Sequence, residues 1–275
     1  MGQKVHPTGL RLGISNNWSS KWNFDPKQNK NSSYREMLQL DLEIQRILRQ
    51  IFKSSKAFLA KVAIHKSPNL NVYDIYISAF LPQERYAFKA GKLRRKFSTQ
   101  INDQIFKRIL QGVKNSLKSK YPEFKFNIHA VLLNQKGSQK RYPRDSIQAQ
   151  AARELRFVSR KPWFDTLLAV LLNLFKTKNP QVLASFIARN LEKTRFQRAV
   201  FQGVSQTVKF LFAKNDALKG IRIQIKGRLN KSKRTQKYVI QCGQVPSQTL
   251  TVPVFYAIDE ANTFYGSMGI KIWVA

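Results

Sequence analysis

Acidic residues are scarce in this 275-residue sequence, with 15 Asp and Glu against 49 Lys and Arg, for a formal net charge of +34. Such a charge opposes compaction unless a polyanion neutralises it. Nucleic acid is the expected partner, because each phosphate contact releases counterions, and an anionic membrane surface is the alternative. Hydrophobic residues still make up 43% of the chain, which excludes wholesale disorder and predicts a packed core.

Cysteine and histidine are also rare. Cys242 is the only cysteine, which excludes an intrachain disulfide and a cysteine-based zinc site, and its alternation with Tyr238 and Ile240 predicts a core thiol. Two of the three histidines, His65 and His129, fall on expected strands, where a structural or solvent-facing role is usual. The motifs HExxH, GxSxG, GxGxxG and the P-loop are absent. We therefore expect no enzyme, no cofactor and no metal site, although a nuclease based on lysine chemistry stays open.

Long apolar runs are missing as well. The most apolar stretch, residues 163–175, is too short to span a bilayer and is expected to pack on a neighbouring helix. Because Arg160, Lys161, Lys176 and Lys178 flank it, an interfacial membrane helix is the alternative.

The most informative stretch is Lys219–Leu250. Apolar and polar residues alternate over residues 221–226, which predicts a half-buried strand with one basic face, and a second strand follows a turn-rich loop. The part from Lys219 to Lys237 holds eight Lys or Arg and no acid, so we expect it to lie on an anion. The expected RNA contacts here are Lys226, Arg228, Lys231, Lys233, Arg234 and Lys237.

The N-terminal half begins with a stretch rich in Gly, Asn, Ser and Pro, residues 1–33, in which Trp18 and Trp22 stand among cations. We expect an extended arm that orders on RNA or on a partner, with a disordered tail as the alternative. The order α-β-β-α-α-β is expected next, with a helix at 34–53, strands at Phe58–His65 and Val72–Leu81, helices at Lys92–Thr99 and Ile101–Lys118, and a strand at Phe124–Leu133.

The C-terminal half is expected to hold two helices within residues 180–213 and then four strands, at 219–229, 237–245, 250–258 and 262–274. The segment Asp259-Glu260-Ala261-Asn262 is expected to be the turn between the last two strands. Two helices packed on one face of an antiparallel sheet would leave the other face for a partner.

Four motifs carry a family resemblance: MGQKVHPTGLRLGI at 1–14, KGIRIQIKGRL at 219–229, GQVPSQTL at 243–250 and YGSMGIKIW at 265–273. They resemble the ribosomal protein S3 family, the universal third protein of the small ribosomal subunit. The resemblance implies an α+β chain with an N-terminal K-homology domain of the second type and a C-terminal two-helix, four-strand α/β domain. The implied domains are an arm at 1–33, a K-homology-like domain at 34–134, a lineage-specific insertion with a short apolar helix at 135–178, and the family's C-terminal domain at 179–275.

The implied function is that of a structural constituent of the small subunit. It would bind small-subunit rRNA in the head, line the channel through which mRNA enters, and contact neighbouring head proteins, without a membrane span and not as a stand-alone homo-oligomer. The alternative is a free-standing RNA-binding or RNA-processing factor. The N-terminal family motif adds Lys4, His6 and Arg11 to the implied RNA contacts.

The sequence departs from the family in two places. A K-homology domain uses a GxxG loop to approach phosphates closely, but here Gly91 is followed by Arg94 where the second glycine belongs. RNA would then be held by charge, through Lys89, Lys92, Arg94, Arg95 and Lys96, and a pure packing module is the alternative.

The second departure lies in the helix whose basic residues face mRNA in the family, here residues 191–204. Arg198 is retained, whereas Gln197, Phe201 and Gln202 occupy positions that are usually basic. Lys193 and Arg195 lie one turn earlier and compensate in part.

The place of action follows from divergence. An N-terminus without an apolar signal segment or an Arg/Ser-rich presequence implies a chain made where it works, or numbered after processing. An added segment, a bacterial-type N-terminal motif and abundant Lys, Asn and Phe favour an organellar ribosome, in the mitochondrion, with the plastid as the alternative.

Overall fold

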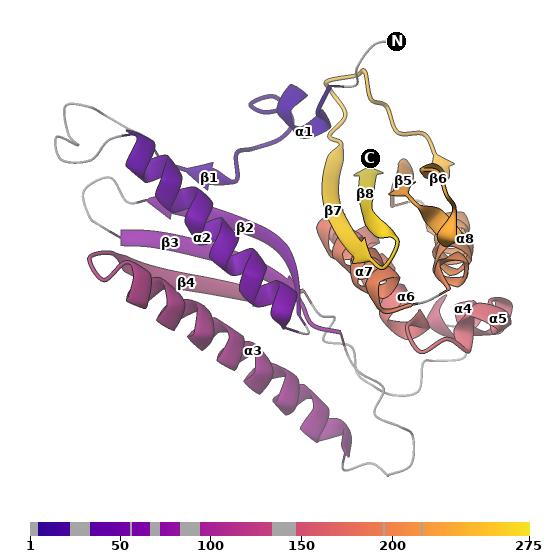
Figure 1. Cartoon of the computed structure of the whole chain (residues 1–275), viewed down its shortest axis with the longest axis horizontal. Helices are drawn as coiled ribbons and strands as arrows, with labels where there is room; N and C mark the ends of the chain where they lie inside the picture. The colour runs from indigo at the N-terminus through magenta and orange to yellow at the C-terminus, as the bar shows by residue number, and fades with distance from the viewer. Residues whose placement is uncertain are drawn as a thin grey trace. The chain divides into compact units, whose positions relative to one another are not determined.

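The computed structural model describes residues 5–22, 34–55, 57–66, 72–82, 94–133, 147–194, 196–215 and 217–275. The chain divides into an N-terminal unit, Trp18–Asn134, and a C-terminal unit, which joins Met1–Asn17 to Gln135–Ala275. The stretch expected as a separate arm is thus divided between the two units, and the segment 135–178 belongs with the C-terminal unit. Figure 1 labels the elements of both.

The N-terminal unit is a sheet with two helices. The sheet runs in the order β1 (Ser20–Lys21), β2 (Phe58–Lys66), β3 (Val72–Phe80) and β4 (Lys125–Leu132). β2 and β3 are antiparallel, whereas β1 pairs with β2, and β3 with β4, in parallel. The helices are α2 (Tyr34–Ser54) and α3 (Arg94–Lys120).

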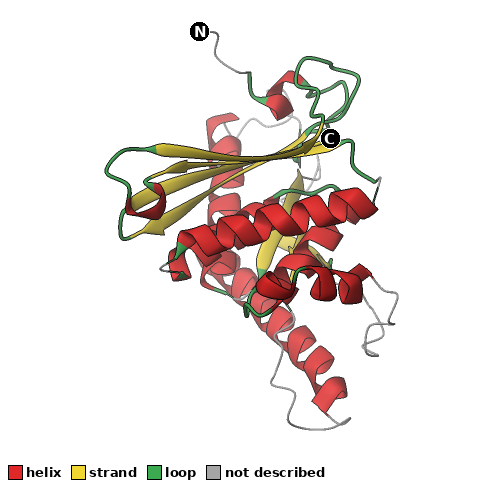
Figure 2. Ribbon diagram, turned by 90° about the vertical axis from the view of Figure 1, so that its right-hand side faces the viewer, coloured by secondary structure: helices red, strands yellow, loops and turns green. Residues whose placement is uncertain are grey.

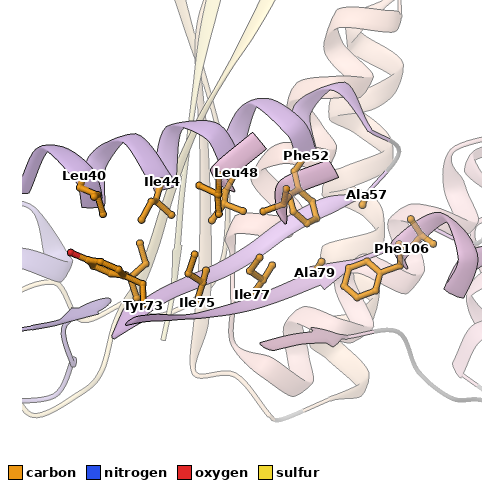
Figure 3. Packing of buried hydrophobic residues seen from close by; sticks show 14 residues of the cluster. Leu40, Ile44, Leu48, Phe52, Ala57, Tyr73, Ile75, Ile77, Ala79 and Phe106 are labelled. Carbon is orange, nitrogen blue, oxygen red and sulfur yellow. The ribbon is translucent and has the colours of Figure 1, made fainter. Parts of the chain in front are cut away.

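The core of this unit forms because α2 repeats apolar residues every three or four positions while the strands alternate. Leu40, Ile44 and Leu48 point from α2 toward Ile75 and Ile77 of β3, as Figure 3 shows, and all five are buried. The expected helix at 34–53 and the three expected strands are confirmed within a residue or two of their bounds.

The expected break between two helices near residue 100 is wrong, because α3 runs without interruption from Arg94 to Lys120. The segment between Thr99 and Ile101 holds only Gln100, a good helix former, and neither Gly nor Pro interrupts the pattern. From α2 to β4 the described elements therefore follow the order α-β-β-α-β.

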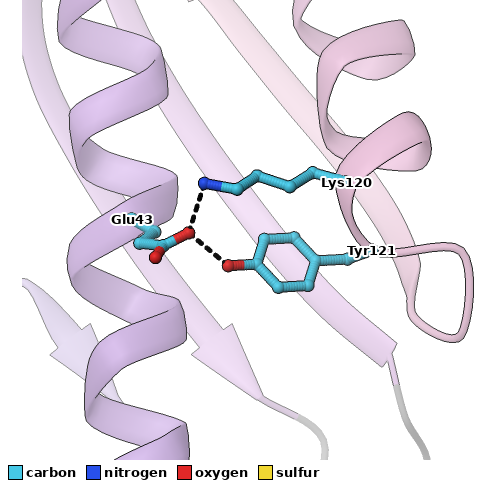
Figure 4. Close-up of polar contacts among 3 residues, drawn as sticks. All are labelled: Glu43, Lys120 and Tyr121. Atoms are coloured by element: carbon cyan, nitrogen blue, oxygen red, sulfur yellow. Dashed lines mark hydrogen bonds and ion pairs between the residues drawn. The ribbon is translucent and has the colours of Figure 1, made fainter.

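A polar contact joins the middle of α2 to the end of α3. One carboxylate oxygen of Glu43 accepts hydrogen bonds from Lys120 Nζ at 2.6 Å and from the Tyr121 hydroxyl (Figure 4). These two bonds lower the pKa of Glu43 to about 2. Burial of the phenol, with the bond to Glu43, raises the pKa of Tyr121 to about 12.

The shifted pKa values predict how stability depends on pH. Because the pKa of Glu43 falls from 4.5 to about 2 on folding, the carboxylate stabilises the fold above about pH 4.5, and this stabilisation is lost as pH falls toward 2. The phenol of Tyr121 stabilises the fold below pH 10, and this stabilisation is lost as pH rises toward 12. Glu43→Gln should therefore lower the free energy of unfolding at pH 6 but have little effect near pH 2, as urea titrations at the two pH values would show. An equal loss at both values would contradict the assignment.

The C-terminal unit has a fully antiparallel sheet in the order β6 (Gln236–Gly243), β5 (Gly220–Gly227), β8 (Gly266–Val274) and β7 (Phe255–Thr263). The helices α7 (Gln181–Lys193) and α8 (Gln197–Lys214) pack along one side of these strands. Figure 2 shows helices in red along one side of the yellow sheet. Two helices and four strands agree with the expectation for residues 179–275.

The apolar stretch 163–175 forms α6 (Phe164–Thr177), which packs on α7 and α8. Leu167, Leu171 and Leu174 are buried, so protein covers the apolar face that the interfacial-membrane alternative requires. The ring of Trp163 fits against α8 at Gly203, where an added Cβ would lie 2.3 Å from the ring. Helices α4 (Ile147–Glu154) and α5 (Arg156–Ser159) precede α6. No helix among the described residues is both long and apolar enough to cross a bilayer.

The expected turn at Asp259–Asn262 is wrong, because these residues lie inside β7 and the hairpin turns at Phe264 and Tyr265. Two hydrogen bonds join this part of β7 to side chains of α7. Asp259 accepts a hydrogen bond from Ser185 Oγ at 2.6 Å, and the amide of Asn262 donates to Glu192 at 3.0 Å.

Candidate nucleic-acid interface

The sheet of the C-terminal unit has one face packed on helices and one open face. Strand alternation decides which side chains share a face. Ile221, Ile223 and Ile225 of β5 are buried on the helix side. Register places the residues of the open face side by side across the four strands, and these are Gln241, Val239 and Lys237 on β6, Arg222, Gln224 and Lys226 on β5, Trp273, Lys271 and Gly269 on β8, and Tyr256, Ile258 and Glu260 on β7.

The cations of the open face gather toward the end of the sheet where β5 passes into the basic loop. Lys226 pairs in register with Lys237, and Lys271 lies opposite Gln224 on the next strand. All three lysines are exposed. Within the loop, Arg228, Lys233 and Arg234 are exposed too. Like charges this close repel one another unless an anion lies between them, so the charge at this end of the face is suited to an anion such as phosphate.

A row of rings crosses the other end of the open face. The Arg222 guanidinium lies 5.6 Å from the Trp273 ring, Trp273 lies 5.4 Å from Tyr256, and Tyr256 lies 4.8 Å from His6. Burial leaves Arg222 Nε without a hydrogen-bond partner among the described residues. Such a row offers both a cation and π-faces to a partner.

The basic loop is fixed by a residue of α8. Gln197, only 3% exposed, accepts a hydrogen bond through Oε1 from the amide of Asn230 at 2.9 Å. Asn230 has a φ of 51°, a left-handed conformation that asparagine tolerates. Arg228 Nε then donates to the carbonyl of Ser232 at 3.1 Å. Gln197 thus holds the loop that carries the cations.

Gln197→Ala tests this role. The change leaves the Asn230 amide unpaired, at a cost of about 1 kcal/mol in loop order, or roughly fivefold in RNA affinity, although no charge is lost. Fluorescence anisotropy with labelled RNA measures the affinity, and hydrogen exchange over 228–235 measures the order. Asn230→Gly is the matched control, since it keeps the amide and tolerates the conformation. Wild-type values for Gln197→Ala in both measurements would contradict the role.

Arg11 requires a correction. It was expected to contact RNA, but it is 0% exposed and its guanidinium donates only to protein carbonyls. The acceptors are the carbonyls of Pro7, Pro246, Ser247, Thr249 and Val252, at 2.7 to 3.2 Å. Arg11 therefore clamps the N-terminal motif to the GQVPSQTL segment. Its neighbour in that motif, His6, is exposed and accepts a hydrogen bond from the Gly9 amide at 3.2 Å through Nδ1.

The remaining expected contacts fall into two groups. Lys193 at the end of α7 and Arg198 at the start of α8 are exposed, and α8 lies against the turn 229–231. The others cannot be located: Lys4, Lys89, Lys92 and Arg195 lie outside the described residues, and of Arg94, Arg95, Lys96 and Lys231 only the backbone is described.

Sequence reasoning placed Arg222 on the basic face of its strand but missed three other members of the open face: Tyr256, Lys271 and Trp273. A signal existed for two of them, because Lys271 and Trp273 alternate with Ile270, Ile272 and Val274 as a two-faced strand requires. Tyr256 fell within the expected strand 250–258, where apolar residues stand at odd and even positions alike and mark no single face.

Other chemistry is weakly represented in the described part of the chain. Cys242 pairs in register with Ile221 on the helix side of the sheet, and burial raises the pKa of its thiol. The described residues include no group of three or more His, Cys, Asp or Glu placed to hold a metal ion. An open sheet face with clustered cations and accessible rings defines the class of protein: it binds nucleic acid.

Comparison with known proteins gives the family. The model of the ribosomal protein S3 C-terminal domain matches residues 187–274. The whole chain is 28% identical to the small ribosomal subunit protein uS3c of Chlorokybus atmophyticus, covering 94% of that protein. It is 26% identical to uS3 of Hydrogenovibrio crunogenus and, over 99% of its length, 28% identical to uS3 of Leptospira biflexa, covering 89% of each. The chain is thus similar to the ribosomal protein S3 family, over its C-terminal domain by the family model and over its whole length by these relatives, as the four motifs indicated.

Proposed function

We propose that this protein is a structural constituent of the small ribosomal subunit and binds small-subunit rRNA through the open face of its C-terminal sheet. The relatives compared above, which align over 99–100% of the chain, are named small ribosomal subunit protein uS3 or uS3c. The observation that carries the RNA contact is the cluster of exposed Lys226, Lys237 and Lys271. The role is structural rather than catalytic, which agrees with the absence of catalytic motifs from the sequence.

The finer proposal concerns placement within the subunit. The protein sits in the head, beside neighbouring head proteins and the channel through which mRNA enters. Exposed Lys193 and Arg198 support a remaining contact with mRNA, although Gln197 serves the basic loop instead. The N-terminal unit is a K-homology domain of the second type, a proposal supported by the order α2-β2-β3-α3-β4 and by the parallel pair β3–β4.

Restoring the second glycine of the degenerate GxxG loop tests whether that loop holds RNA by charge. If the residues from Lys89 to Lys96 hold RNA by charge, Arg94→Gly removes a charge and restores a glycine without gaining close backbone approach. RNA affinity should then stay equal or fall slightly in an anisotropy titration. A clear gain in affinity would show that a second glycine is what the loop lacks.

The proposed place of action is the mitochondrial ribosome, with the plastid ribosome as the alternative. Identities of 26–28% to bacterial and plastid relatives support a lineage that has diverged strongly. Fractionation of purified organelles, with an antibody against the chain, distinguishes the two.

Sedimentation tests the function itself. A ribosomal constituent co-migrates with the small subunit in a gradient at moderate salt. A free-standing RNA-binding factor would instead remain in a pool at the top of the gradient, and that result would overturn the proposal. Degradation of labelled RNA by the purified chain would point to a nuclease.

A further inference from the structure

A depression of about 590 Å³ lies on the open face where β5 and β8 meet the basic loop. Lys226, Arg228 and Lys271 line it together with Gln224 and Tyr265, and none of its described lining residues is a carboxylate. Three cations around one hollow favour a phosphate group, and the polar side chain of Gln224 can bond a sugar hydroxyl or a second oxygen.

Glycine keeps this depression open. Gly269 lies on β8 opposite Lys226, and a Cβ placed there would meet nothing within 4 Å. A larger side chain at this position would therefore occupy the space over the strand rather than collide with protein. The missing side chain lets a ligand approach the backbone between the lysines.

Two aromatic residues, Phe264 and Tyr265, form the tip of the β7–β8 hairpin, which borders the depression. Thr263 pairs with Gly266, and Thr263 Oγ1 donates to the Gly266 carbonyl at 2.7 Å, which fixes the turn. Tyr265 lines the depression. Phe264, next to it, is 102% exposed, so its ring has both faces free of protein. A phenylalanine ring so exposed, one residue away from the lining of a basic depression, is what an unpaired nucleobase stacks on.

We propose that the depression and the hairpin tip form a site for single-stranded RNA. Lys226, Arg228 and Lys271 hold one backbone phosphate over Gly269, and the adjacent unpaired base stacks on Phe264. The site rests on the proposed function, since it specifies which RNA the open face takes. Paired RNA fits less well, because the bases of a duplex are stacked on one another and offer no free ring face.

Binding of the full chain to two labelled probes tests the site: a single-stranded oligoribonucleotide of about 10 nucleotides and the same strand in a duplex. Phe264→Ala should weaken the single strand about tenfold and the duplex little. Gly269→Val, which fills the depression, should weaken the single strand and reduce its salt slope by about 0.7, the share of one phosphate. Phe157→Ala, which removes a ring 76% exposed on α5, is the matched control and should change neither.

The outcomes separate this site from the proposed function. Wild-type affinity for both probes in Phe264→Ala and Gly269→Val overturns the site and leaves the RNA-binding function standing. If the same two variants bind RNA normally but no longer co-sediment with the small subunit, the face docks a protein, and this result also overturns the site. A wild-type chain that binds neither probe contradicts both proposals. Because Phe264 makes no buried contact, its replacement does not depend on refolding the sheet.

Discussion

Replacing Arg11 by methionine is expected to destabilise the C-terminal unit by about 3 kcal/mol, because the charge-assisted hydrogen bonds from the buried guanidinium to five carbonyls are lost. Methionine has a similar length but no donor, so the carbonyls of Pro246, Ser247, Thr249 and Val252 lose this partner. The effect should be local at first. Residues 5–17 and 244–254 should lose protection in hydrogen exchange, while α7 and β5 keep theirs.

Two further variants make the test sharper. Arg11→Lys supplies three donors in place of five and should give an intermediate loss. Arg160→Met removes an exposed arginine of the same unit and should leave stability unchanged. An Arg11→Met chain as stable as wild type, with unchanged exchange at both segments, would show that Arg11 does not clamp them.

The largest effect on RNA binding is expected when alanine replaces Lys226, Lys237 and Lys271 together. Each lysine that neutralises a phosphate of single-stranded RNA contributes about 0.7 to the slope of log affinity against log salt. The triple variant should therefore flatten the slope by about 2 and lose roughly a hundredfold in affinity at low salt. The fold should be unaffected, since all three side chains are exposed.

The matched control for this variant removes the same charge elsewhere in the same unit. Arg153 on α4, Arg160 directly after α5 and Lys176 on α6 are exposed, and none of them belongs to the sheet. Their replacement by alanine lowers only the general attraction of the chain for RNA, so the slope should change little. Equal losses in the two triple variants would mean that net charge, and no particular surface, binds RNA.

Local patterns predicted much of the fold, because periodicity reports directly on burial. The alternation over residues 221–226 and the helical spacing in 34–53 identified the strand β5 and the helix α2. The loop 228–237 could be predicted as basic for the same reason: charge is a property of residues close together in sequence.

Features that depend on distant partners could not be predicted. The sequence gives no sign that Arg11 is buried, because carbonyls that accept its hydrogen bonds lie more than 230 residues away. Asp259 reads as a turn residue because its partner Ser185 is on α7. The role of Gln197 could not be predicted, because its bond to Asn230 joins α8 to a loop that lies beyond β5 in the sequence.

The central claim is that the open face of the C-terminal sheet lies on rRNA. A cryo-EM map of the assembled small subunit tests it most directly. The account predicts RNA density within hydrogen-bonding distance of Lys226, Lys237 and Lys271, and against the loop 228–237. A map in which this face is covered by another protein, or faces solvent while rRNA contacts the chain elsewhere, would contradict it.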